Sequence, residues 1–293
     1  MSEQKLEVFN VLNFLDRGYE VEDILKEGQF GTFPSAQDCI DYLVKEGYLT
    51  CEGGAITAEE ISKKYTVADL KGLLKENGLK VSGKKQELVD RILPILNEGA
   101  SAGNYELTDK AQEFIKENDW IDLYMFALAA FRFEDYEIYV EGSSAGKIET
   151  ALNFCDEVLS RTLVNNQFLI FLDGLTAKAH VYAYDNDYGS FLDYDLQRYI
   201  LGLNPISLDA QSYAIYNVID EANIINLRNV LEKLDMGSLK KRFDRIWNLC
   251  KIKNTTVPKK TCYKILQRAL DGADIEELNF DLKEKYFNKK FGI

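Results

Sequence analysis

The sequence lacks features that several classes of protein require. Its 293 residues include only four prolines and one histidine, and no Ser/Gly tract is present, so long low-complexity linkers are not expected. The longest uncharged apolar run, LYMFALAAF at 123–131, is too short to cross a bilayer, and no membrane segment is expected. The N-terminus MSEQKLEVF lacks the charged-then-apolar pattern of a signal peptide, which predicts a cytoplasmic protein.

Metal-binding and catalytic patterns are also missing. The five cysteines show no C-x-x-C spacing and no histidine cluster accompanies them, so no metal and no cofactor is expected. They are predicted to be reduced and mostly buried: Cys39, Cys51, Cys155, Cys250 and Cys262. The single histidine, His180, lies in the apolar segment FLDGLTAKAHVYAY and is predicted to be packed. The sequence therefore predicts a protein that is not an enzyme.

The composition is that of a soluble globular protein, with 46% hydrophobic and 28% charged residues, and the length suits two or three domains. The net charge of −13 is unevenly distributed. Residues 1–62 hold 4 basic and 13 acidic side chains, and residues 119–239 hold 7 and 19. Residues 63–92 hold 8 basic against 4 acidic, and residues 240–268 hold ten against one. Binding of a polyanion would have to use these two basic islands.

The first island predicts a helical hairpin. Thr66 can cap a helix with Asp69 at the capping-box position, and Gly78 ends that helix. Ser82 is expected to open the second helix. The apolar positions recur at helical spacing on each helix: Val67, Leu70, Leu73 and Leu74, then Leu88, Val89, Ile92 and Leu93. Free N–H groups and the helix dipole at Gly83, Lys84 and Lys85 favour an anion there.

The segment TVADLKGLLKENGLKVSGKKQELVDRI, from Thr66, strongly resembles a SAP module, the two-helix DNA-binding motif of chromatin and DNA-repair proteins. The resemblance extends to about Leu96, roughly a tenth of the chain, and implies contact with duplex DNA of modest sequence preference. The DNA-binding residues that it implies are Lys80, Ser82, Gly83, Lys84 and Lys85, with Lys71 and Arg91 as flanking backbone contacts.

The sequence around this segment predicts a frame that the hairpin interrupts. Residues 35–50 read as a helix capped by Ser35 and running into a strand, and residues 104–118 read as a strand, a Thr108 cap and a helix. This order resembles a winged helix whose two strands pair across the insertion. Residues 7–15 and 21–28 would supply the first two helices of this frame. Its third helix, at about 35–46, carries Asp38, Asp41 and Glu46, which disfavour phosphate contact.

The remainder, from residue 119, reads as an all-α domain. The second basic island spans two expected helices, one capped by Ser238 and one beginning at Pro258. Packed antiparallel, they would form a patch of Lys240, Lys241, Arg242, Arg245, Lys259, Lys260, Lys264 and Arg268. This patch is either a second DNA contact or a basic face that is solvated or docked on the acidic residues 119–239.

The sequence thus predicts a mainly α fold of three parts. Residues 1–62 and 99–118 form a winged-helix-like frame, residues 63–98 an inserted SAP hairpin, and residues 119–293 a helical domain. The expected function is that of a non-enzymatic protein of bacterial or bacteriophage type that binds double-stranded DNA, with the helical domain serving assembly or partner binding. The alternative is an acidic inhibitor or decoy of a DNA-processing or host-defence protein. The oligomeric state is left open.

Overall fold

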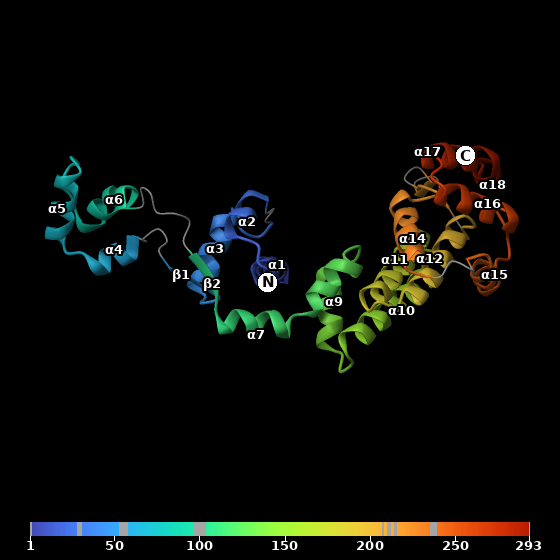
Figure 1. Cartoon of the computed structure of the whole chain (residues 1–293), viewed down its shortest axis with the longest axis horizontal. Coiled ribbons are helices and arrows are strands. Elements are labelled where there is room, and N and C mark those ends of the chain that lie inside the picture. The colour runs from blue at the N-terminus through green and yellow to red at the C-terminus, as the bar shows by residue number, and fades with distance from the viewer. Residues whose placement is uncertain are drawn as a thin grey trace. The chain divides into compact units, whose positions relative to one another are not determined.

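A computed structural model describes residues 2–27, 31–52, 58–96, 104–206, 208–209, 212–213, 216–234 and 239–292. The protein is mainly helical, as predicted, with one two-stranded sheet in the described ranges. It divides into two compact units, residues 1–119 and 120–293. Figure 1 shows the elements along the chain.

The first unit contains a frame built around its own core. Its helices are α1 (Ser2–Asp16), α2 (Val21–Glu27), α3 (Ala36–Lys45) and α7 (Asp109–Glu117). The predicted Ser35 cap is confirmed, because its side chain accepts a hydrogen bond from the Asp38 N–H at 3.2 Å. The core joins apolar side chains from α1, α2, α3, the first strand and α7: Val8, Val11, Leu12, Val21, Ile24, Cys39, Ile40, Leu43, Leu49 and Ala111.

Two strands join the ends of the interrupting segment. Strands β1 (Leu49–Glu52) and β2 (Asn104–Leu107) pair antiparallel, with Leu49 opposite Leu107 and Glu52 opposite Asn104, which confirms the predicted pairing across the insertion. The predicted Thr108 cap of α7 is also confirmed, and its hydroxyl donates to the Gly47 carbonyl at 2.8 Å. The chain therefore leaves the frame and returns to it at adjacent strand ends.

Between the strands lies a second core made by three helices, α4 (Ala58–Lys64), α5 (Val67–Glu76) and α6 (Lys85–Leu96). Its six fully buried side chains are Ile61, Leu70, Leu74, Leu88, Val89 and Ile92. Val67, expected on this apolar face, is 39% exposed instead. The sequence reading did not anticipate α4, and the boundary placed between residues 62 and 63 falls inside it. Because Ile61 packs in this core, α4 is part of the same small helical unit.

The second unit is helical throughout its described residues. Its elements are α8 (Trp120–Leu123), the π-helical η1 (Tyr124–Leu128), α9 (Phe133–Glu141), α10 (Lys147–Val164), α11 (Phe168–Tyr184), α12 (Tyr188–Gly202), α14 (Glu221–Lys233), α15 (Leu239–Leu249), α16 (Lys259–Leu270), α17 (Ile275–Leu282), the π-helical η2 (Lys283–Phe287) and α18 (Asn288–Phe291). One large core joins α11, α12 and α14 to the C-terminal helices. Ser238, predicted to cap α15, lies outside the described residues.

The cysteines behave as small apolar residues. All five are free thiols, and Cys39, Cys155 and Cys262 are buried, which confirms that they are mostly buried. Burial raises the pKa of each of these three thiols to about 12. They therefore stay protonated at neutral pH and are poor nucleophiles.

Candidate nucleic-acid interface

Both ends of α5 are fixed by local hydrogen bonds. At its start, the Thr66 hydroxyl accepts from the Asp69 N–H at 3.3 Å, and the Asp69 carboxylate accepts from the Thr66 N–H at 2.8 Å. Bonds from the Thr66 hydroxyl and then its N–H lower the pKa of the Asp69 carboxyl. At its end, Gly78 is left-handed with φ +67°, and the Leu79 N–H donates to the Leu74 carbonyl at 2.8 Å. The predicted capping box and glycine stop are confirmed.

The start of α6 differs from the prediction. The helix begins at Lys85, and the Leu88 N–H donates to the Lys84 carbonyl at 3.1 Å, so Lys84 occupies the cap position. The assignment of Ser82 as the opening residue is therefore wrong. The chain reaches Lys84 through Gly83 at φ +143°, a conformation that side chains with a Cβ rarely adopt. This geometry needs glycine and places residues 80–84 in an exposed turn between α5 and α6.

A carboxylate lies beside this turn. A Cβ placed on Gly83 would lie 2.6 Å from the Glu87 Oε2 atom, so the Glu87 side chain folds back over the position ahead of α6. Glu87 stands three residues after the Lys84 cap, as in a capping box. This spacing is visible in the sequence and was missed as a sign that Lys84 caps α6. An anion that approaches the turn at Gly83 would face this negative charge.

Two of the predicted DNA-binding cations are used inside the hairpin. The Lys85 ammonium donates to the Ser62 carbonyl of α4 at 2.7 Å and is only partly exposed. The Arg91 guanidinium donates to the Lys80 carbonyl and, at 3.2 Å, to the Ser82 carbonyl. Lys85 therefore joins α6 to α4, and Arg91 holds the turn in place.

The other predicted cations point to solvent. Lys71 on α5 and Lys80 and Lys84 in the turn are exposed, and none of them makes an ion pair within the described residues. Ser82 and Gly83 are exposed between the two turn lysines. The turn thus brings Lys80, Ser82, Gly83 and Lys84 together as a polar, positively charged surface, and these groups are the ones free to meet an anion.

The second island is divided in the same way. Four of its eight cations are engaged: Asp193 of α12 pairs with Arg242 at 3.0 Å and Arg245 at 2.6 Å, and Asp244 pairs with Lys240 and, at 2.9 Å, Lys259. Exposed cations without an ion pair among the described residues are Lys241, Lys260, Lys264 and Arg268. Two arginines therefore dock α15 on the acidic segment, while one face of α16 keeps its charge.

His180 is packed among aromatic rings. It stacks on Phe191 with ring centroids 6.1 Å apart, its Nε2 lies 3.4 Å from the Asn226 amide nitrogen, and burial lowers its pKa. In the described ranges, no three His, Cys, Asp or Glu side chains gather so that they could hold a metal ion. No helix in those ranges has the length and apolar character of a bilayer span.

Comparison with protein families gives a match to this hairpin. A SAP domain is found at residues 62–96. The matched segment covers α5, the exposed turn and α6, so the resemblance read from the sequence is confirmed. The SAP domain indicates a capability for binding DNA or chromatin. Comparison with curated proteins and with solved structures finds no match.

Proposed function

We propose that this protein binds double-stranded DNA through its SAP hairpin and catalyses no reaction on it. The observation that carries the proposal is the surface formed by Lys80, Ser82, Gly83 and Lys84. It is exposed, and neither lysine is neutralised by an ion pair within the described residues. The chain as a whole has a net charge of −13, so this turn is a local positive surface on an acidic protein. Its charge suits a phosphate backbone.

In the proposed mechanism the hairpin acts as a preformed clamp on the backbone. Lys80 and Lys84 contact phosphates, Lys71 contacts a flanking phosphate, and the Ser82 hydroxyl and the Gly83 backbone approach the duplex closely. Lys85 and Arg91 were expected from the sequence to touch DNA; in this mechanism Lys85 joins α6 to α4 and Arg91 positions the turn instead. Phosphate contacts release counterions, so binding is steeply salt-dependent. Because these contacts carry no base sequence, binding is weakly specific, and base readout is limited to the minor groove.

The frame enters the proposal as a winged-helix-like support. Helices α1, α2 and α3 precede an antiparallel ribbon, and the hairpin occupies the position of a wing tip. Exposed Asp38 and Asp41 on α3 face solvent, which favours a structural or partner-docking role for that helix. The bacterial or bacteriophage type and the cytoplasmic location stay predictions from the sequence.

The helical second unit supplies assembly or partner binding in this proposal, and it adds a second DNA contact on α16. Lys260, Lys264 and Arg268 are four residues apart, so they follow one face of the helix at intervals of about 6 Å along its axis. All three are exposed and make no ion pair among the described residues. Such a row of cations fits a polyanionic backbone.

The decisive experiment measures duplex binding over a salt series for Lys80→Gln/Lys84→Gln. Each phosphate contact contributes about 0.9 to the slope of log affinity against log salt, so this slope should fall by about 2. The matched control, Lys45→Gln/Lys63→Gln, removes the same number of charges. Lys45 lies on α3, and Lys63 on α4 is paired with Glu59, so this variant should keep the wild-type slope. An unchanged slope in the first variant would sink the proposal, as would magnesium-dependent cleavage of the duplex.

The alternative function is that of an inhibitor or decoy, in which the acidic body binds a DNA-processing or host-defence protein. The excess of acidic over basic side chains in residues 119–239, 19 against 7, favours it. If the full chain binds no duplex at low salt but captures a purified nuclease or recombinase, this alternative replaces DNA binding.

A further inference from the structure

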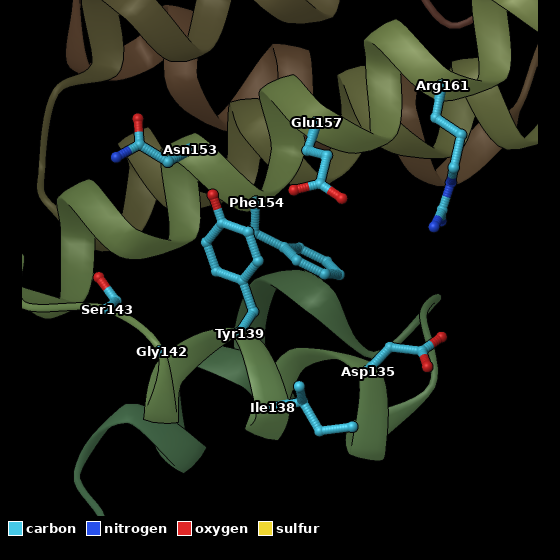
Figure 2. Close-up of a pocket in the computed structure, with 9 residues that line it drawn as sticks. All are labelled: Asp135, Ile138, Tyr139, Gly142, Ser143, Asn153, Phe154, Glu157 and Arg161. Atoms are coloured by element: carbon cyan, nitrogen blue, oxygen red, sulfur yellow. The ribbon is translucent and has the colours of Figure 1, made fainter.

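A cleft of about 550 Å³ lies between α9 and α10 in the second unit. Figure 2 shows side chains from both helices converging on it, with the rings of Tyr139 and Phe154 at its centre. These two rings meet edge to face, with centroids 5.4 Å apart and an interplanar angle of 72°. Phe154 is buried and Tyr139 is partly exposed, so the cleft has an aromatic floor.

Each wall of the cleft carries a carboxylate. Asp135 comes from α9 and Glu157 from α10, and Figure 2 shows them on opposite sides of the aromatic pair. Both are exposed, and neither makes an ion pair within the described residues. Burial is the largest cause that raises the pKa of the Tyr139 hydroxyl, and the nearby negative charge of Glu157 is the next. The two carboxylates therefore place negative charge on both walls of the cleft.

The rim adds apolar surface and one opposing charge. Ile138 on α9 is 69% exposed and lines the cleft. Arg161 lies at one end, and it too makes no ion pair among the described residues. The surrounding chain is acidic, with 19 acidic and 7 basic side chains in residues 119–239. Charge and shape together favour a cation with an apolar stem.

We propose that this cleft binds a basic polypeptide segment of a partner protein. The aliphatic stem of a lysine or arginine lies against Tyr139 and Phe154, and its cationic head lies between Asp135 and Glu157. Cation–π attraction and charge-assisted hydrogen bonds favour such a head group, and an apolar neighbour in the segment packs on Ile138. Arg161 weakens binding of this ligand, because it places a like charge at the end of the cleft.

The test uses the full chain and two fluorescent peptides, a Leu-Lys-Leu-Arg core in a Gly/Ser background and its Leu-Glu-Leu-Glu counterpart. Anisotropy at low salt should show binding of the basic peptide only. Asp135→Asn/Glu157→Gln should weaken it about tenfold, the combined effect of two exposed charges. Glu149→Gln, an exposed carboxylate on the same helix outside the cleft, is the control for general charge and should change affinity less than twofold.

Arg161→Gln distinguishes a basic ligand from one without positive charge. Removing this like charge should tighten binding of the basic peptide about twofold to threefold. The proposal is overturned if the cleft variant binds like the Glu149→Gln control, if Arg161→Gln weakens binding, or if the acidic peptide binds better. Lys80→Gln/Lys84→Gln should leave peptide binding unchanged, so the outcome is independent of DNA binding by the hairpin. Near-UV circular dichroism verifies that each variant keeps the packing around the aromatic floor.

Discussion

The Lys85 ammonium donates a hydrogen bond to the Ser62 carbonyl oxygen at 2.7 Å and thereby joins the first turn of α6 to α4. The two residues are 23 positions apart, and the bond is partly buried. Lys85, which the sequence predicts to contact DNA, thus has a structural partner. Adjacent Lys84 has none among the described residues, so two neighbouring lysines have separable roles.

The first prediction is that Lys85→Met lowers the stability of the hairpin and leaves the salt slope of DNA binding unchanged. Methionine keeps an unbranched apolar stem, so the main loss is the hydrogen bond to Ser62, about 1 kcal/mol. Amide hydrogen exchange in α4 and α6 measures the local free energy of opening. Lys84→Met provides the comparison: it should reduce the salt slope by about 1 and leave exchange unchanged. If Lys85→Met reduces the slope as well, its ammonium contacts phosphate.

The second prediction is that Glu87→Gln strengthens DNA binding. The Glu87 carboxylate lies beside Gly83, at the turn where the proposed phosphate contacts are made. Removing an exposed charge from this position should raise affinity about twofold to fivefold at low salt, and the gain should shrink as salt screens it. Fluorescence anisotropy with a labelled duplex measures the change.

Gln86, the neighbour of Glu87, supplies no negative charge, so Asp90→Asn on the next turn of α6 serves as the charge-matched control. Asp90 accepts a hydrogen bond from Gln86 at 2.9 Å and should have a smaller effect than Glu87. Equal gains from both substitutions would mean that only the net charge of the hairpin matters, and that the Glu87 side chain does not oppose the anion at the turn.

The third prediction concerns the cations of the second basic island. Lys260→Gln/Lys264→Gln/Arg268→Gln should reduce the salt slope of duplex binding by about 3 if all three residues of the α16 row contact phosphates. Lys240→Gln/Lys259→Gln removes cations that pair with Asp244 and should change the slope little. Equal effects of the two variants, after allowing for the number of charges, would assign the island to general attraction rather than contact. These substitutions leave the hairpin unchanged, so its own contribution to the salt slope should remain in both variants.

The helix caps were predictable from sequence because they depend on short-range relations. Ser35, Thr66 and Thr108 each accept a hydrogen bond from an N–H three residues later, and this spacing is visible in the chain. Pairing of β1 with β2 across the insertion is a long-range contact, and it was predicted from the helix–strand and strand–helix order on either side of the insertion, which resembles a winged helix.

The roles of Lys85, Arg242 and Arg245 were not predictable, since their partners are distant in sequence. Arg242 and Arg245 meet Asp193 across 49 and 52 positions, and Lys85 meets Ser62 across 23. For these three residues, packing of the helices decides which partner each cation meets. Composition identified both basic islands correctly as charge-rich segments, but it could not divide either into engaged and free residues.

The buried carboxyl group of Asp195 gives the second unit a pH dependence. This residue of α12 is 2% exposed, and its Oδ2 atom has no hydrogen-bond partner in the described part of the chain. Burial is the largest cause that raises its pKa, to about 7; the charge of Arg198 lowers it, and the charge of Asp220 raises it. Nearby Asp173 also has a raised pKa through burial, with the same two charges acting on it.

The fourth prediction follows from the sign of this shift. An aspartate in the unfolded chain has a pKa near 3.9, so the folded state holds the Asp195 proton more tightly. The stability that this proton contributes is fully present below about pH 4 and is lost as pH rises through about 7. The loss is on the order of 1.4 kcal/mol per pH unit at most. Asp195→Asn replaces the carboxyl with a neutral group of the same shape, so the variant should lose less stability over this range than the wild type does.

Both tryptophans, Trp120 and Trp247, lie in the second unit, so their fluorescence during urea unfolding reports on the unit that contains Asp195. The informative quantity is the difference in unfolding free energy between Asp195→Asn and wild type, because contributions from the many other carboxylates cancel in it. This difference should grow in favour of the variant from pH 4 to pH 7. Asp271→Asn, at the exposed end of α16, should show a constant difference. Parallel stability curves for Asp195→Asn and wild type would mean that Asp195 is ionised in the folded protein, with its charge compensated by Arg198.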